Sequence, residues 1–472
     1  MSELTASYVD VGRQSKNTKN AGRIIYIVLM AFCLVSYLWA LAIGAGIQNM
    51  PVIIWIARIA TVPFAMYYGK LWRNKGFLLL FTYTVLFFLR CFIPDPNSIF
   101  NEEVAENILS ALWLFTACYG LGFILNGKQI KTFLLICSGI WLMGITIFSC
   151  LGIYAAWTEQ VIKTFGEGTI QLDVLDAAVR LSIIYLPTIS GSILGISVLI
   201  IVIAFICLQN RLSKILCVLA MIPLIFALAL TDSRTAFISV PTGFAVVVFA
   251  VVYNVFQKRS QADKVNNYKS WVFGILAMFV AFILLVFLLL HITPLFNSIK
   301  MRGIIPAAYA EVVEKVSIAN RGFSGDRILH GRAELWSSVI EHIKQNPIVL
   351  LTGESKLAPL RSFDDFYAHC HCLYLQVLLE SGIPGLLLFL SFIIYTIVHA
   401  IKVIRTPSLP LWIRLLPALP ISLWVGDIAE TFTWLRSSQC PMGAIAIISA
   451  GIICAQKTKL CGDIKQTNEP II

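Results

Sequence analysis

The residues with the clearest capacity for chemistry lie in FYAHCHCLYLQVLLESGIPG, residues 366–385, where two histidines alternate with two cysteines. A neutral imidazole accepts a proton near pH 7, so His369 or His371 could act as a general base. Histidine and cysteine also bind zinc, and two thiols can form a disulfide. Alternatively, both histidines only cap the helix that follows. The surrounding sequence has to separate these four interpretations.

The spacing disfavours the zinc site and the disulfide. Structural zinc sites usually take ligand pairs with roughly two to four residues between the two ligands, plus a distant second pair. The other candidate ligands are scattered without paired spacing: His291, His330, His342 and Cys440. A disulfide between Cys370 and Cys372 would close across a single residue, which strains the bond. We therefore expect no metal ion in this stretch.

Several arginines are candidates for binding an anion. The motif TDSRTAF, residues 231–237, places Asp232 and Arg234 between two apolar segments, where charge must be hydrated or paired. The two side chains either pair with each other or leave the planar Arg234 guanidinium to bind phosphate oxygens. Arg327 and Arg332 flank the sequence ILHG before a helical pattern. They either contribute to the same kind of site or are solvated surface charges.

The elements that must position these residues are membrane helices. Of the 472 residues 58% are hydrophobic and only 13% are charged, about half the charged share of a soluble domain. A hydrocarbon core about 30 Å thick needs roughly 20 apolar residues in a helix. We predict an all-α integral membrane protein with about 12 transmembrane helices, at 24–47, 51–69, 76–93, 108–125, 132–155, 189–208, 215–231, 236–254, 270–291, 383–401, 411–429 and 441–456.

The loops between these spans predict the orientation. Every second loop is rich in lysine and arginine, which by the positive-inside rule places both termini in the cytoplasm. The net charge of +11 is thereby explained by topology, and we expect no nucleic-acid partner. The first 23 residues are polar and basic and predict no cleavable signal peptide. The expected units are a tail (1–23), nine helices (24–291), a large outer loop (292–370), an outer helix with three membrane helices (371–456) and a second tail (457–472).

Two helices are predicted on the outer side. RAELWSSVIEHIKQN, residues 332–346, carries apolar residues at helical spacing, and this amphipathic helix could pack on the membrane surface or on the bundle. Pro347 ends it. In the opening stretch, glycines on both sides of Pro384 interrupt a helical run. Residues 372–381 therefore form a short outer helix that leads into a membrane span.

Three motifs carry a resemblance to a known family. The pattern H-x-x-Y-L-x-x-x-x-E-x-G-I-x-G-L-L, from His371 to Leu387, resembles the signature of the O-antigen ligase and polymerase superfamily. DSRTAF resembles its second signature, and GRAELW followed by NPIVLLTGES resembles the beginning of its large periplasmic loop. Motif order, topology and loop length agree with the family, and the resemblance covers about residues 220–400.

The resemblance implies an enzyme: a metal-independent, inverting glycosyltransferase of the GT-C type that needs no cofactor. Its active site would lie on the periplasmic face of the bacterial inner membrane. The donor would be a glycan on undecaprenyl diphosphate, and for a ligase of lipopolysaccharide biosynthesis the acceptor would be lipid A–core. By position, His371 would be the catalytic base and Arg234 would contact the donor diphosphate. The expected substrate-binding residues are Arg332, Arg327, His369 and Tyr374.

Some alternatives stay open at this stage. The family usually has asparagine where this chain has Cys372, and the neighbouring histidines leave open which one is the base. A polymerase of the same superfamily would join lipid-linked repeats and would share the site. A transporter or flippase would instead use charge inside the membrane, and Arg58 and Arg90 are the features that favour it.

Overall fold

Helices dominate the computed structural model, which describes residues 20–37, 52–92, 102–158, 160–163, 169–175, 178–183, 187–231, 233–263, 268–301, 332–354, 370–431 and 441–466. Within these residues, nine helices are long and apolar enough to cross a membrane, which makes the chain a multi-pass helical membrane protein. They are Asn20–Tyr37, α2 (Val52–Gly69), the continuous run Ala105–Ile124, α6 (Gly127–Thr158), α7 (Pro187–Cys207), α8 (Arg211–Thr231), α9 (Arg234–Asp263), α10 (Tyr268–Met301) and α17 (Leu373–Arg405).

The three other predicted spans also contain helices. The predicted span 76–93 corresponds to α3 (Lys75–Phe92). The predicted span 411–429 is divided into α18 (Leu411–Leu415) and α19 (Ala418–Gly426), because Pro417 stands between them. The last helix is α20 (Pro441–Gln466). The apolar parts of the last two spans, Leu411–Gly426 and Pro441–Gln456, are shorter than a typical transmembrane helix. A total of twelve spans therefore stays a prediction.

The structure also contains a small antiparallel sheet, which the all-α prediction did not include. Its strands are β1 (Ile162–Lys163), β2 (Thr169–Leu175) and β3 (Ala178–Ile183), in the order β1-β2-β3. Ile170 pairs with Ile183 in the ladder, and both side chains are buried. The sheet lies against α6, where an added Cβ at Gly152 would be 3.0 Å from the Leu181 side chain.

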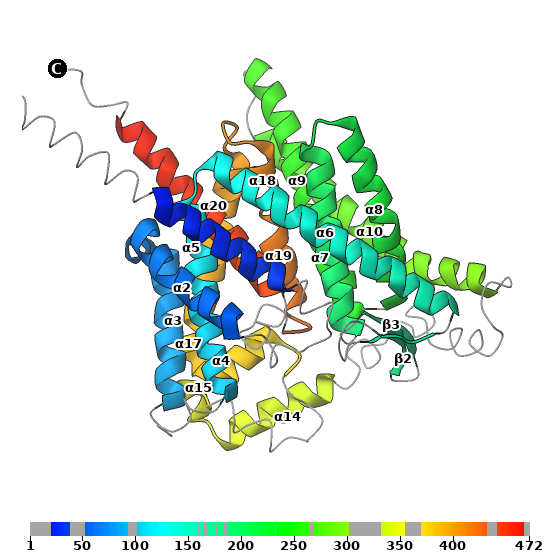
Figure 1. The fold of residues 1–472 in the computed structure, drawn as a ribbon, viewed down its shortest axis with the longest axis horizontal. Helices are drawn as coiled ribbons and strands as arrows, with labels where there is room; N and C mark the ends of the chain where they lie inside the picture. Colours follow the sequence, from blue (N-terminus) through cyan, green and yellow to red (C-terminus); the bar gives the residue numbers. More distant parts are fainter. Residues whose placement is uncertain are drawn as a thin grey trace, which may run out of the picture.

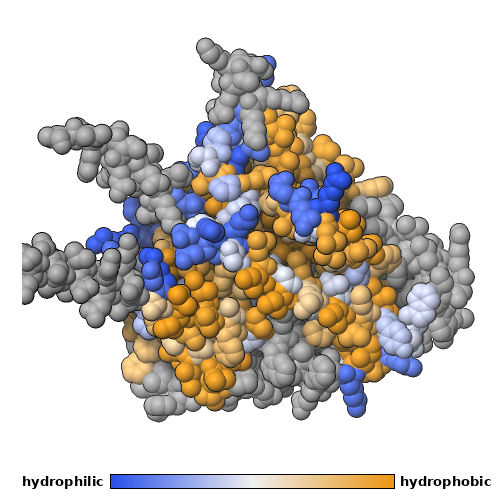
Figure 2. Space-filling view, turned by 45° about the horizontal axis from the view of Figure 1, so that its top comes forward, coloured by the Kyte–Doolittle hydropathy of each residue, from blue (hydrophilic) through white to orange (hydrophobic). Residues whose placement is uncertain are grey.

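The helices form a bundle with two distinct ends (Figure 1). The helices α14 (Arg332–Gln345) and α15 (Val349–Thr352) lie at the same end as β2 and β3, and the C-terminal part of α20 extends from the other. We call the first of these the α14 end. Figure 2 shows hydrophobic side chains over much of the flank, with hydrophilic side chains gathered in the upper part of the view. This distribution fits a bundle whose flank faces lipid.

Arg58 lies inside the bundle and has no exposed surface. Its guanidinium carbon lies 4.6 Å from the Trp113 ring centroid, 4.9 Å from that of Trp55 and 5.2 Å from that of Tyr37. The electron-rich ring faces attract the cation, which is how an arginine is tolerated in an apolar helix. Its three side-chain nitrogens have no hydrogen-bond partner among the described residues.

The rings around Arg58 come from separate helices. Trp113 is the first residue of the π-helix η4 (Trp113–Cys118), which joins α4 (Glu102–Leu112) to α5 (Tyr119–Ile124). The wider turn of a π-helix shifts the side chains that follow it relative to a regular α-helix. Tyr37 and Trp113 also contact each other, with ring centroids 6.2 Å apart. The aromatic enclosure thus joins the first helix, α2 and η4.

Candidate active site

The site is built around His371, immediately before the first turn of α17. Cys372 is the N-cap residue of α17, and the Leu373 N–H donates to the carbonyl oxygens of Asp427 (2.9 Å) and Glu430 (3.1 Å). The segment after α19 therefore closes around the start of α17 and satisfies an N–H group that has no partner within the helix. His371 itself has φ 48°, in the left-handed region. Histidine adopts this conformation uncommonly, and such residues often mark functional sites.

Glu430 joins the imidazole to an arginine. Its Oε1 lies 2.7 Å from His371 Nδ1, and its Oε2 lies 3.1 Å from Arg332 Nη2. The Glu430 side chain is 5% exposed, whereas 26% of the His371 side chain is exposed. A buried carboxylate that contacts Nδ1 favours the tautomer in which Nδ1–H donates to it. The other ring nitrogen, Nε2, is then the atom able to accept a proton.

The helix α14 brings Arg332 to this place. Its buried side chains Leu335, Val339 and Ile343 recur at helical spacing, and the last two pack in a cluster with Cys370 and Leu379. The Trp336 indole N–H donates to the Cys370 carbonyl at 2.9 Å. The predicted helix is confirmed, and the structure answers the question of what it covers. It lies across the α14 end and packs on the first part of α17 (Figure 1).

Polar side chains hold the first part of α17 in place. Gln376 accepts from the Cys370 N–H at 3.0 Å and donates to Glu380 at 2.6 Å. The Tyr374 hydroxyl donates to the Trp424 carbonyl of α19 at 2.8 Å. Tyr374 thus braces α17 against α19. The role in substrate binding expected for it stays a prediction.

Two glycines allow α17 to kink where the sequence predicts a break. Gly382 has φ 65° and Gly353, directly after α15, has φ 69°, both in the region that favours glycine. An added Cβ at Gly353 would lie 2.6 Å from backbone atoms of Glu380, and one at Gly382 would lie 2.9 Å from the Gly353 nitrogen. The backbones therefore touch. Arg90 of α3 donates to the Gly353 carbonyl at 2.5 Å and holds the same point from the other side.

The start of α9 lies beside the segment that carries Glu430. A Cβ added at Gly426, the last residue of α19, would be 3.6 Å from Thr235 and 3.1 Å from Ser239. Arg234 directly precedes Thr235 and is the first residue of α9. Its backbone is therefore close to the Asp427–Glu430 segment. The Arg234 side chain, Asp232, Arg327 and His369 lie outside the described residues.

The two cysteines next to His371 are free thiols. Burial is the main cause that raises the pKa of the Cys372 thiol, and burial together with the nearby Glu380 raises the pKa of Cys370. Both thiols therefore stay protonated at neutral pH, which makes them poor nucleophiles. Within the described part of the chain, no group of three or more histidine, cysteine or acidic residues could hold a metal ion.

Part of the chain matches a known family. Residues 219–390 match a family model described as O-antigen ligase. The matched residues are less than half of the chain. This match confirms the resemblance to the ligase and polymerase superfamily. No curated protein matches the chain. The matched segment includes Arg234, Arg332 and His371, whereas Glu430 lies beyond its end.

Sequence reasoning missed Glu430, the residue that links the site together. The available signal was weak: GDIAE, residues 426–430, places two acidic residues directly after an apolar run. The predicted span 411–429 included Asp427 and so concealed the end of the helix. The structure ends α19 at Gly426, which leaves both acidic residues in the segment that contacts α17.

Proposed function

We propose that this protein is an O-antigen ligase, which transfers a glycan from undecaprenyl diphosphate to the lipid A–core acceptor of lipopolysaccharide. The observation that carries the proposal is the 2.7 Å contact between His371 Nδ1 and Glu430, made by a histidine inside the segment that matches the family. It orients a partly exposed imidazole so that Nε2 is available as a base.

In this mechanism, His371 Nε2 accepts the proton of an acceptor hydroxyl as its oxygen attacks the anomeric carbon of the donor sugar. The new glycosidic bond forms as the bond from that carbon to the diphosphate breaks, with inversion at the carbon. Undecaprenyl diphosphate leaves with the electron pair, and the proton remains on His371. Glu430 stabilises the resulting imidazolium, because its carboxylate already lies against Nδ1.

Arginines would stabilise the diphosphate leaving group. Arg332 lies within 3.1 Å of Glu430, which places a guanidinium beside the base. Arg234, at the start of α9, adds a second guanidinium that suits the oxygens of a diphosphate. Arg327 and His369 are proposed to line the same site from the 292–370 loop. Such fixed charges stabilise the negative charge that develops on the diphosphate, so the chemistry needs no metal ion.

The proposed topology follows the charge pattern of the sequence. The α14 end, with His371, would face the periplasm and both termini would lie in the cytoplasm, in the bacterial inner membrane. The 292–370 segment would then be a large periplasmic loop. This orientation supplies the site with both lipid-linked substrates in the outer leaflet.

The test is glycan transfer by the purified, membrane-reconstituted protein, offered lipid A–core and a second lipid-linked repeat as separate acceptors. A ligase elongates lipid A–core, whereas a polymerase of the same superfamily elongates the lipid-linked repeat. We expect the first product, its loss in His371→Ala, and no effect of a chelator. Full transfer by His371→Ala would exclude His371 as the base, and strong inhibition by the chelator would contradict the metal-free mechanism.

A further inference from the structure

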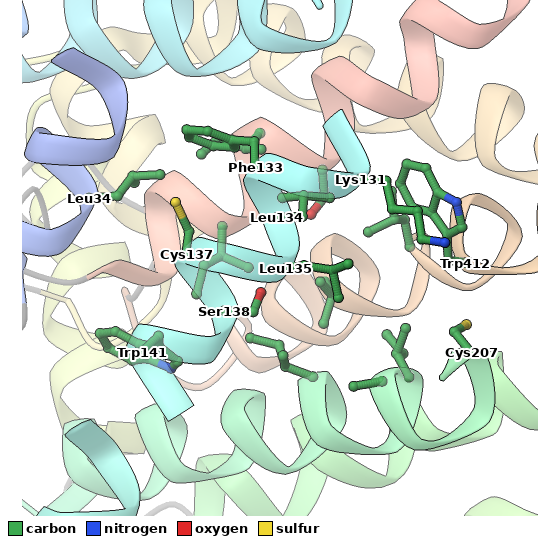
Figure 3. A pocket seen from close by; sticks show the side chains of 18 of the residues that line it. Leu34, Lys131, Phe133, Leu134, Leu135, Cys137, Ser138, Trp141, Cys207 and Trp412 are labelled. Atoms are coloured by element: carbon green, nitrogen blue, oxygen red, sulfur yellow. The ribbon is translucent and has the colours of Figure 1, made fainter. Parts of the chain in front are cut away.

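A cavity of about 420 Å³ lies in the flank of the bundle, apart from the candidate active site. Its walls come from the first helix, α6, α7, the α18–α19 segment and α20, and none of its lining residues belongs to the His371 site. Figure 3 shows α6 crossing the cavity with many of its side chains in the lining. Leu135, on this part of α6, is 46% exposed, so the cavity reaches the surface that faces lipid.

The polar and apolar residues of this cavity are separated. Lys131, Gln209 and Asn210 lie together, because α6 begins and α7 ends at this part of the bundle. In Figure 3, Lys131 and Trp412 lie at one end and Leu34 and Trp141 at the other. Most other lining residues are aliphatic, aromatic or cysteine, with Ser138 and Ser449 the small exceptions. The Trp141 indole N–H is already bonded to Ser197 at 2.9 Å.

Such a lining matches an amphiphile with a negatively charged headgroup and long apolar chains. Phosphate suits the Lys131 ammonium, and the glutamine and asparagine side chains add hydrogen-bond donors beside it. The donor of the proposed reaction is a poor match. Its diphosphate must reach His371 at the α14 end, whereas Lys131 lies near the beginning of α6, the end of α6 away from the sheet.

We propose that this cavity binds an anionic glycerophospholipid, with its phosphate at Lys131 and its acyl chains along α6, α7 and α20. A lipid there would fill the space between the first helix and the rest of the bundle. The proposal concerns a site separate from His371 and does not depend on the transfer reaction.

The test is native mass spectrometry of the full chain, equilibrated with equal amounts of phosphatidylglycerol and phosphatidylcholine of identical acyl chains. One lysine near a membrane phosphate is worth about 1 kcal/mol, so we expect about a five-fold preference for phosphatidylglycerol. Lys131→Gln should remove that preference. Lys128→Gln is the matched control: it removes the same charge one turn away, from an exposed side chain outside the lining.

A second variant tests the acyl-chain part of the cavity. Ser138→Phe places a ring in the apolar part of the lining while keeping Lys131, and it should lower the amount of both lipids retained. Equal retention of the two lipids by the unaltered protein would overturn the proposal. So would a preference that survives Lys131→Gln, or recovery of undecaprenyl phosphate in place of the glycerophospholipid.

Discussion

At the scale of single residues, Glu430 is the group that gives His371 a defined orientation. Its two carboxylate oxygens contact different partners, His371 and Arg332, and the carboxylate is almost completely buried. A buried carboxylate interacts more strongly with a neighbouring base and cation than a carboxylate in water does, because the local dielectric constant is low. The catalytic proposal for His371 therefore depends on a residue that the family segment does not contain.

We predict that Glu430→Gln lowers the rate of glycan transfer roughly 10²- to 10⁴-fold, the range for removing an orienting carboxylate from a catalytic base. The amide retains a hydrogen bond but can no longer stabilise the imidazolium. The measurement is the single-turnover rate at saturating donor. Glu341→Gln is the control, because Glu341 is 58% exposed and pairs with Lys344 on the surface of α14. Equal rates for the two variants would remove Glu430 from the mechanism.

Cys372 makes a second prediction possible. It is the N-cap residue of α17, and a thiol is a weaker hydrogen-bond acceptor than the side-chain oxygen of asparagine. Asparagine is among the strongest N-cap residues and stabilises a helix by about 1 kcal/mol relative to alanine. We therefore expect Cys372→Asn to retain transfer and to raise the melting temperature relative to Cys372→Ala, as measured by thermal unfolding in detergent. A lower melting temperature for Cys372→Asn would contradict the capping role.

At the scale of elements, the site depends on the contact between Gly353 and Gly382. The kink at Gly382 separates the first part of α17, which directly follows His371 and Cys372, from the longer apolar part. Gly353 fits against this kink and continues into Glu354, whose N–H donates to the Leu379 carbonyl at 2.5 Å. The backbones meet at Gly353 and Gly382. A side chain added at either glycine would therefore push the two segments apart.

We predict that Gly382→Ala destabilises the protein by about 2 kcal/mol or more, because φ 65° with ψ −172° is a backbone region that almost only glycine adopts, at a cost of about 1–3 kcal/mol for other residues. The clash with Gly353 adds to this cost. Gly139→Ala is the control, since an added Cβ there would meet no atom within 4 Å. Thermal unfolding of the two variants in detergent gives the comparison. Equal melting temperatures would show that the kink tolerates a side chain.

Much of this local architecture was predictable from the sequence, because it depends on neighbouring residues. The apolar spacing of α14 and the glycines around Pro384 each act within a few positions. The contact between Glu430 and His371 was not predictable in this way, since nothing near Glu430 indicates which helix it meets. The sheet was not predictable for the same reason. The alternating pattern TIQLDVL is short, and its buried face packs against α6, which lies outside this local sequence pattern.

At the scale of the whole molecule, the orientation of the bundle decides on which side of the membrane the His371 site lies. The loops predict that the α14 end lies outside, and the structure places α14, α15 and the sheet at a common end. Positive loops set orientation during insertion. The predicted side and the observed arrangement are thus consistent, although they derive from different properties of the chain.

We predict that alkaline phosphatase fused after residue 346 is active, because its disulfides form only in an oxidising compartment such as the periplasm. Fusions after residue 263 and at the C-terminus should be inactive, and green fluorescent protein at these two positions should fluoresce. Enzyme activity and fluorescence in intact cells are the measurements. The reverse pattern would place the His371 site in the cytoplasm, away from the proposed substrates.

The aromatic enclosure of Arg58 has a consequence for how the protein is made. Residues are synthesised from the N-terminus, so α2 reaches the membrane before Trp113 has left the ribosome. An arginine in the middle of an inserting helix opposes insertion by roughly 2.5–3.5 kcal/mol. Until η4 arrives, Tyr37 and Trp55 are the rings, among those that the structure describes against Arg58, that can face the charge. Stable insertion of α2 therefore waits for a later helix, and the N-terminal third of the bundle has to assemble as a unit during biosynthesis.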